Sequence, residues 1–149
     1  MNESSLTQSE ADALLALPKV KVDDEIHQFP GLGGKLIVEL ISKDKREHFL
    51  LNIYRGRIEI SRGNYTTRAR GTVILARLDF GGSPHRNPDG EEIDCPHLHL
   101  YREGFGHKWA FPIPPDLFEN VEDPWQTLHD FMRFCAIEDP PQIVRGLFA

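Results

Sequence analysis

Residues 97–113 decide the fold that we predict, and they read HLHLYREGFGHKWAFPI. Polar and apolar side chains alternate on both sides of residues 103–106, where two glycines allow the positive φ angles of a tight turn. Successive side chains of a strand point to opposite faces of its sheet. The pattern therefore predicts a β-hairpin with strands over residues 97–102 and 107–113, and the prolines from Pro112 onward are expected to end the second strand.

The two faces of this hairpin differ in polarity. A turn at residues 103–106 places His99 opposite Ala110 and Leu98 opposite Phe111. The apolar face then carries Leu98, Leu100, Trp109 and Phe111. The polar face carries His97, His99, Tyr101, Lys108 and Ala110. Cross-strand neighbours on one face lie about 5 Å apart, so the polar side chains are expected to form a single patch.

The loop before the hairpin, residues 81–96, is rich in glycine and proline and is expected to hold no regular element. Loops of this length in compact domains are often functional. This loop brings a further histidine, His85, which we expect to complete the polar patch from outside the sheet.

Helices are predicted near both ends of the chain. Thr7 and Glu10 have the spacing of a capping box, and Pro18 ends this short N-terminal helix. Asp123 and Pro124 begin a second helix, which has one apolar face and is expected to end at residues 139–141. Runs rich in β-branched and aromatic residues predict strands over 35–41, 47–54, 57–61 and 72–80, with turns at 43–46 and 63–64.

The expected fold is a single α+β domain over residues 1–149. A mostly antiparallel β-sheet forms its centre, with the short N-terminal helix and the C-terminal helix packed on it. The chain has two cysteines, which excludes a disulfide framework, and no apolar run long enough to span a bilayer. We therefore expect a cytoplasmic protein without membrane contact.

The net charge of −6 is unevenly distributed. The segment 55–77 carries +5, which leaves −11 for the rest of the chain. Its basic residues are Arg55, Arg57, Arg62, Arg68, Arg70 and Arg77. Arginine has a planar fork that suits phosphate, so these side chains are candidates for binding nucleic acid. The alternative is an ordinary solvated surface, as most charge runs are.

The polar patch of the hairpin allows three interpretations. It is a solvated sheet face, where polar residues merely alternate with core residues. Or it is a metal site that uses Cys95, His97 and His99. Or it performs metal-independent acid–base chemistry on RNA, with His97, His99 and Lys108 as catalytic groups and His85 and Tyr101 in support. The third interpretation leads among the chemical ones because it also uses the arginines, and it requires no cofactor.

The stretch PHLHLYREGFGHKWA, residues 96–110, resembles the signature of an uncharacterised bacterial domain family. LTQSEAD at 6–12 and PHRNPDG at 84–90 resemble further parts of it, so the resemblance covers nearly the whole chain. It implies a small stand-alone bacterial protein associated with mobile elements and host–phage conflict, and it brings no established activity. His85 followed by the His-x-His strand is also loosely similar to small RNase toxins of the barnase, EndoU and RelE type.

Two classes of function follow from these patterns. The first is a ribonuclease-like or RNA-binding protein that grips phosphates with its arginine-rich strands. The alternative is a non-catalytic binding protein, such as an antitoxin, an anti-defence inhibitor or an accessory subunit. Such a protein would meet a protein partner through its acidic surface.

Overall fold

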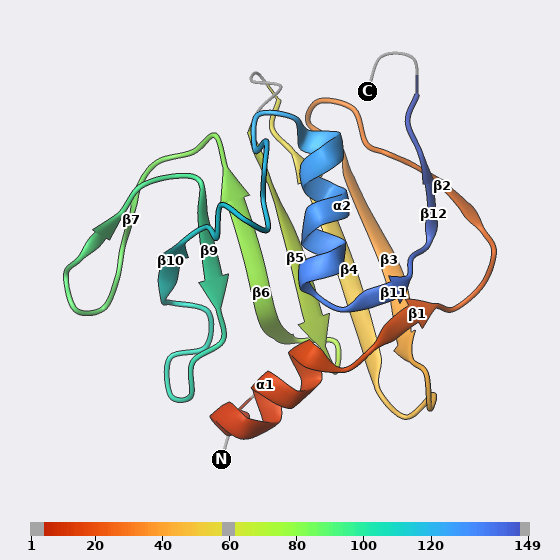
Figure 1. The fold of residues 1–149 in the computed structure, drawn as a ribbon, viewed down its shortest axis with the longest axis horizontal. Coiled ribbons are helices and arrows are strands. Elements are labelled where there is room, and N and C mark those ends of the chain that lie inside the picture. Colours follow the sequence, from red (N-terminus) through yellow and green to blue (C-terminus); the bar gives the residue numbers. More distant parts are fainter. Residues whose placement is uncertain (1–4, 58–61, 147–149) are drawn as a thin grey trace.

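A computed structural model describes residues 5–57 and 62–146, and it confirms the predicted α+β fold (Figure 1). The main sheet has the strand order β10-β9-β6-β5-β4-β3-β1-β11. Its strands are β1 Lys19–Lys21, β3 Lys35–Ser42, β4 His48–Arg55, β5 Gly63–Ala69, β6 Val73–Phe80, β9 His97–Leu100, β10 Ala110–Pro112 and β11 Ile137–Asp139. Neighbouring strands run antiparallel except β1 and β11, which are parallel.

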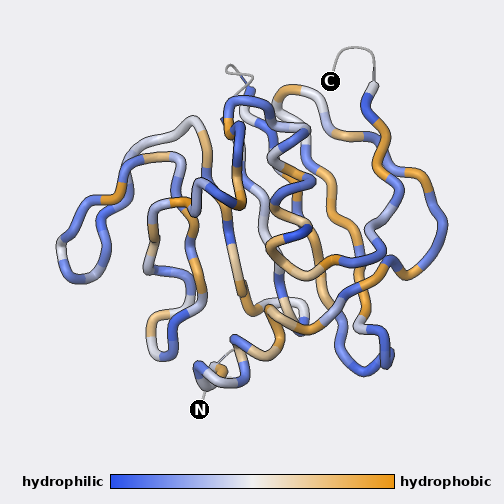
Figure 2. The backbone as a smooth tube through the Cα atoms, viewed as in Figure 1, coloured by the Kyte–Doolittle hydropathy of each residue, from blue (hydrophilic) through white to orange (hydrophobic). Residues whose placement is uncertain are grey.

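Two small strand pairs lie beside the main sheet. The strands β2 Ile26–Gln28 and β12 Gln142–Val144 form a parallel pair. The strands β7 His85–Arg86 and β8 Glu92–Ile93 form an antiparallel pair. The second pair lies within residues 81–96, where we expected no regular element, and it projects at the left of Figure 1. Figure 2 shows that the loop of this pair is largely hydrophilic.

Both helices begin where the sequence predicts. Helix α1 spans Gln8–Ala16, and its Thr7 and Glu10 form the capping box. Helix α2 spans Pro124–Phe134, and the Asp123 side chain accepts hydrogen bonds from the first-turn amides. α2 ends earlier than expected because Ala136, at φ +59°, reverses the chain into β11. Neither helix within residues 5–57 and 62–146 is long and apolar enough to cross a membrane.

Helix α2 covers one face of the sheet and forms the core with it (Figure 1). The Tyr65 hydroxyl donates to the carbonyl of Pro124 at 2.7 Å, and the Tyr65 ring packs against Phe131 of α2. Cys135 is buried at the end of the helix and accepts a hydrogen bond from Thr67. Helix α2 therefore packs on the apolar face of β4, β5, β6 and β9. It does not cover the opposite face of these strands.

The predicted hairpin is present, and β9 and β10 pair in the predicted register, but the turn is tighter than expected because Arg102 pairs with Gly106. Ala110 pairs with His99, and Phe111 pairs with Leu98. The second strand is shorter than expected, because β10 spans three residues and the chain before it forms turns.

Two aromatic side chains of the predicted apolar face lie outside the core. The Trp109 ring packs against Phe105 and lies under the guanidinium of Arg102. Phe111 is 38% exposed because β10 is an edge strand of the main sheet. The hairpin therefore has its own small aromatic cluster beyond the end of the sheet.

One strand was missed. No strand was predicted over the residues of β5, and Gly63 and Asn64 were expected to form a turn, but they begin β5 and pair with Arg55 and Tyr54 of β4. A Cβ atom at Gly63 would lie 2.4 Å from the Tyr54 carbonyl oxygen, so glycine serves a close approach of two strands here. Most of the strand predicted over 57–61 lies outside the described residues, since 58–61 are not among them.

Candidate functional site

The sheet face opposite α2 carries two adjacent rows of polar side chains. In the first row, Tyr54, Asn64, Asp79 and His97 are direct cross-strand neighbours on β4, β5, β6 and β9. In the second row, two residues along each strand, the neighbours are Asn52, Thr66, Arg77, His99 and Ala110. Cross-strand neighbours on one face are close enough to touch, so the antiparallel register itself assembles the site.

Asn87 attaches the β7–β8 pair to this site. Its side-chain amide donates to the Ala110 carbonyl and accepts from the Ala110 amide, at 2.9 and 2.8 Å. Asn87 thus satisfies the edge of β10 as a neighbouring strand would, and it is itself buried. This contact brings His85 of β7 against the histidines of β9.

Three histidine rings gather here. The ring centroid of His85 lies 4.6 Å from that of His99 and 5.9 Å from that of His97, and the latter two are 5.0 Å apart. His97 is 2% exposed and His99 is 0% exposed, whereas His85 is partly exposed. The interpretation as a solvated sheet face therefore does not describe His97 and His99. Burial lowers the pKa of His97, which favours its neutral form.

Asp79 is the centre of the polar contacts. Its carboxylate accepts two hydrogen bonds from Arg77, at 2.9 and 3.0 Å. Its Oδ2 also lies 3.3 Å from Nε2 of both His97 and His99. Burial alone would raise the pKa of Asp79, but the contacts with His99 and Arg77 outweigh it and hold the pKa at about 2. The carboxylate is therefore ionised at neutral pH.

The orientation of His99 is fixed from its other side. Its Nδ1 lies 2.8 Å from the carbonyl oxygen of His107, which can only accept, so Nδ1 carries a proton. His97 differs, because its Nδ1 is buried without a hydrogen-bond partner among the described residues. The network is thus not fully satisfied, and buried polar atoms without partners are uncommon in folded proteins.

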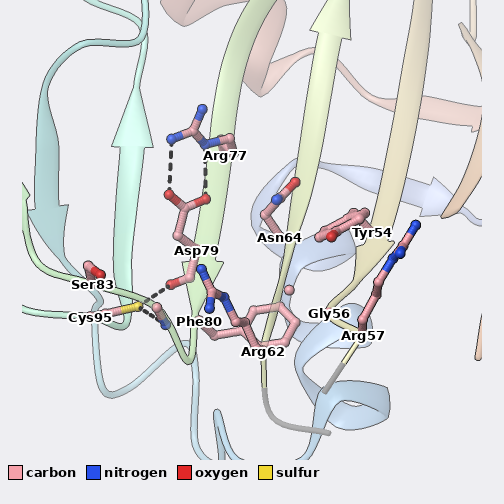
Figure 3. A pocket seen from close by; sticks show the side chains of 12 residues that line it. Tyr54, Gly56, Arg57, Arg62, Asn64, Arg77, Asp79, Phe80, Ser83 and Cys95 are labelled. Atoms are coloured by element: carbon pink, nitrogen blue, oxygen red, sulfur yellow. Dashed lines mark hydrogen bonds and ion pairs between the residues drawn. The ribbon is translucent and has the colours of Figure 1, made fainter. Parts of the chain in front are cut away.

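A pocket of about 590 Å³ adjoins this network (Figure 3). Its lining includes three of the predicted arginines, Arg57, Arg62 and Arg77. Figure 3 shows Arg77 and Asp79 on one side, Tyr54 and Arg57 on the other, and Asn64 between them. The pocket is of a size that takes small ligands, and its cations favour an anionic one.

Comparison with known proteins identifies the family. A family described as "Family of unknown function (DUF6978)" matches residues 6–137. The chain belongs to this family. The resemblance to an uncharacterised domain family is thereby confirmed. No curated protein and no solved structure matches the chain, and the similarity to RNase toxins stays a prediction.

The other three arginines of this DUF6978 chain lie away from the pocket. Arg55 points into the core, where it stacks on Phe29 and donates to the Pro30 carbonyl. Arg70 pairs with Glu47 at the far end of β5. Arg68, half-buried on β5, does not line the pocket either. Alternation along each strand and the turn after β5 separate residues that are neighbours in sequence.

Two residues of the predicted patch lie elsewhere. Tyr101 follows the last residue of β9, and its hydroxyl contacts the backbone of Leu6. Lys108 lies in the turn before β10 and is exposed, and its carbonyl oxygen lies 2.7 Å from Nε2 of His85. Both positions were predicted from strand alternation. This alternation does not apply to Tyr101 and Lys108, because they lie outside β9 and β10.

Asp79 replaces Cys95 in the group that was predicted as a metal site. The Cys95 sulfur accepts from the Gly82 amide at 3.2 Å and donates to the Asp79 carbonyl at 3.4 Å. Burial raises the pKa of the Cys95 thiol, which therefore stays protonated at neutral pH. Asp79 was missed because a single carboxylate on a strand resembles a solvated residue. The alternation of side chains along β6 nevertheless puts Asp79 on the same face as Arg77.

Proposed function

We propose that the chain binds RNA and holds a phosphate of the bound strand in the pocket lined by Arg57, Arg62 and Arg77. The gathering of these three guanidinium groups on one pocket carries the proposal, because the chain is otherwise acidic. A guanidinium donates two parallel hydrogen bonds to phosphate oxygens, which a single lysine cannot do.

The aromatic side chain in the pocket favours a single-stranded nucleic acid over a simple anion. Tyr54 is 41% exposed on the open sheet face, beside Asn64 of the next strand. An exposed ring on a sheet gives an unpaired base a surface to stack on, worth about 1–3 kcal/mol per base. Phosphate binding by the arginines and stacking on Tyr54 would then act on neighbouring parts of one strand.

Cleavage of the bound RNA is the further part of this proposal. His97 and His99 are buried and contact Asp79, so they position that carboxylate and Arg77 rather than touch the RNA. His85 is the partly exposed histidine of the cluster, and it is our candidate for acid–base chemistry on the substrate.

The test of binding is fluorescence anisotropy with a short labelled single-stranded RNA, in EDTA and at low salt. We expect the double variant Arg57→Gln, Arg62→Gln to bind about tenfold more weakly than the wild type, because two phosphate contacts are lost. The control is Arg70→Gln, which removes an arginine from the far end of β5 and should change binding less than twofold. Equal losses in both variants, or no binding by the wild type, would contradict the proposal.

Cleavage is tested on the same RNA by gel electrophoresis, again in EDTA. We expect product from the wild type and none from His85→Ala. Binding without any cleavage would leave an RNA-binding protein and remove the catalytic part of the proposal.

A further inference from the structure

Asp79 and His99 bring two possible metal-ligand atoms together. Because Nδ1 of His99 donates to a carbonyl, a neutral ring has its lone pair on Nε2. That atom lies 3.3 Å from Oδ2 of Asp79. Two electron-rich atoms face each other at this distance only when a proton, another cationic group or a metal ion lies beside both.

A proton on Nε2 of His99 would suit Asp79 but not Arg77. Nη2 of Arg77 lies 3.1 Å from His99 Nε2, and a guanidinium nitrogen can only donate. A proton on Nε2 would therefore leave two donors facing each other, whereas a cationic group or a metal ion beside both Nε2 and Oδ2 avoids this. The guanidinium contacts two of the clustered atoms, Asp79 Oδ2 and His99 Nε2, at 3.0 and 3.1 Å.

A metal ion would bind a third atom as well. Oδ2 of Asp79 lies 3.3 Å from Nε2 of His97 too, and ligand atoms of Asp79, His97 and His99 all lie within 4.8 Å of one another. Ligand atoms about 2.1 Å from a tetrahedral ion lie roughly 3.4 Å apart. These separations from Oδ2 therefore fit one ion with three protein ligands.

We propose that Asp79, His97 and His99 bind one divalent transition-metal ion, with Zn²⁺ the best match, and that Arg77 stands in for the ion when it is absent. Two imidazoles and a carboxylate are ligands that Zn²⁺ accepts, with a fourth position left open. The hydrogen bond from His99 Nδ1 to a backbone carbonyl is the support that metal-binding histidines usually have. The adjoining pocket gives the displaced Arg77 side chain space to turn into.

The inference does not depend on RNA binding. The arginines of the pocket are expected to hold phosphate in EDTA, whereas the metal site is tested without RNA. Failure of one experiment therefore leaves the other unaffected.

The experiment is metal titration of the full chain, purified without a histidine tag and stripped with EDTA. Co²⁺ is added first, because its visible absorption reports a site of low coordination number, and Zn²⁺ is then used to displace it. We expect one equivalent of bound Co²⁺, its displacement by Zn²⁺, and a higher melting temperature with Zn²⁺. Uptake below about one-tenth of an equivalent would overturn the proposal, since a site of high affinity stays loaded.

Variants then locate the bound ion. Asp79→Asn keeps the size of the side chain and should lower Zn²⁺ affinity at least tenfold. Substitution of a residue that merely supports a metal ligand already lowers metal affinity that much. Arg77→Met should bind Zn²⁺ at least as tightly as the wild type, because the competing guanidinium is gone.

The chain provides a matched control. Asp23, Glu25 and His27 form a second group that meets the same distance limit, but Asp23 and Glu25 are exposed and His27 is only partly buried. His27→Ala should leave the bound metal unchanged. Loss of binding in His27→Ala together with retention in Asp79→Asn would overturn the proposal. The wild-type Co²⁺ spectrum needs no variant, so it tests the site even where a substitution unfolds the chain.

Discussion

Tyr101 shows how one side chain joins the hairpin to the start of the chain. Its hydroxyl donates to the Leu6 carbonyl at 2.8 Å and accepts from the Leu6 amide at 2.7 Å. Its own amide donates to the Leu75 carbonyl, next to the position where the pairing of β5 and β6 shifts by one residue. Because β6 bulges there, the alternation of β9 does not continue to Tyr101, and the ring joins the core cluster.

A structural role for Tyr101 makes a prediction that a catalytic role does not. Tyr101→Phe removes the hydroxyl and leaves two buried backbone groups of Leu6 without this partner. We expect the free energy of unfolding to fall by about 1–3 kcal/mol, measured by urea denaturation, with RNA binding unchanged. Tyr54→Phe is the control, because no hydrogen bond of the Tyr54 hydroxyl is seen among the described residues. Lost RNA binding at unchanged stability would instead return Tyr101 to the site.

At the scale of elements, local signals predicted the fold well where they act within one segment. The capping residues located both helix starts, and the alternation of residues 97–100 fixed the register of β9 with β10. The strand β5 was not predicted, because its first residue, Gly63, reads as a turn but serves close contact with β4, a partner that no local pattern reveals. The short strands β1, β2, β11 and β12 pair over long sequence separations, which local patterns do not report either.

The candidate site was predictable in part for the same reason. His97 and His99 follow from strand alternation, and His85 was expected beside them. Asp79 and Arg77 reach these histidines through the pairing of β6 with β9, which the sequence did not show. The arginines lie in the core, on the surface and in the pocket, although they are close in sequence. The alternation of side chains along each strand and the positions of the strand ends determine where each arginine points.

Lys19 links the ends of both helices. Its ammonium donates to the carbonyls of Leu15, Leu17 and Cys135, which lie at the C-terminal ends of α1 and α2. Burial lowers the pKa of Lys19 from 10.5 to about 8. Below pH 8 both the folded and the unfolded chain carry the positive charge of Lys19. Folding then bears the full free-energy cost of burying this charge.

The lowered pKa predicts how stability changes with pH. Between pH 8 and 10.5 the folded chain loses the Lys19 proton while the unfolded chain keeps it, so rising pH favours the folded state. We expect the wild type to gain on the order of 2 kcal/mol relative to Lys19→Met across this range. Urea denaturation of both proteins at several pH values measures it, and subtraction removes the other titrating groups. A constant difference between the two proteins would contradict a lowered pKa.

At the scale of the whole molecule, the net charge of −6 restricts where a nucleic acid can make contact. Arg55 is buried in the core, and Arg70 pairs with Glu47. Arg57 and Arg62 remain exposed on the pocket, and Arg77 joins them from β6. Outside the segment 55–77 the chain carries −11, which repels nucleic acid. Contact is therefore expected to be local, with a few phosphates and not a long stretch of backbone.

The salt dependence of RNA binding tests this local contact. Each phosphate neutralised on a single strand contributes about −0.7 to the slope of log K against log salt concentration. Three arginines, one already paired with Asp79, predict a slope of about −1 to −2. The slope is measured by anisotropy over a range of monovalent salt. A slope near zero would exclude phosphate contact, whereas about −4 or steeper would require a wider cationic surface than the arginine pocket supplies. The variant Arg57→Gln, Arg62→Gln should flatten the slope by about 1, because two phosphate contacts are lost.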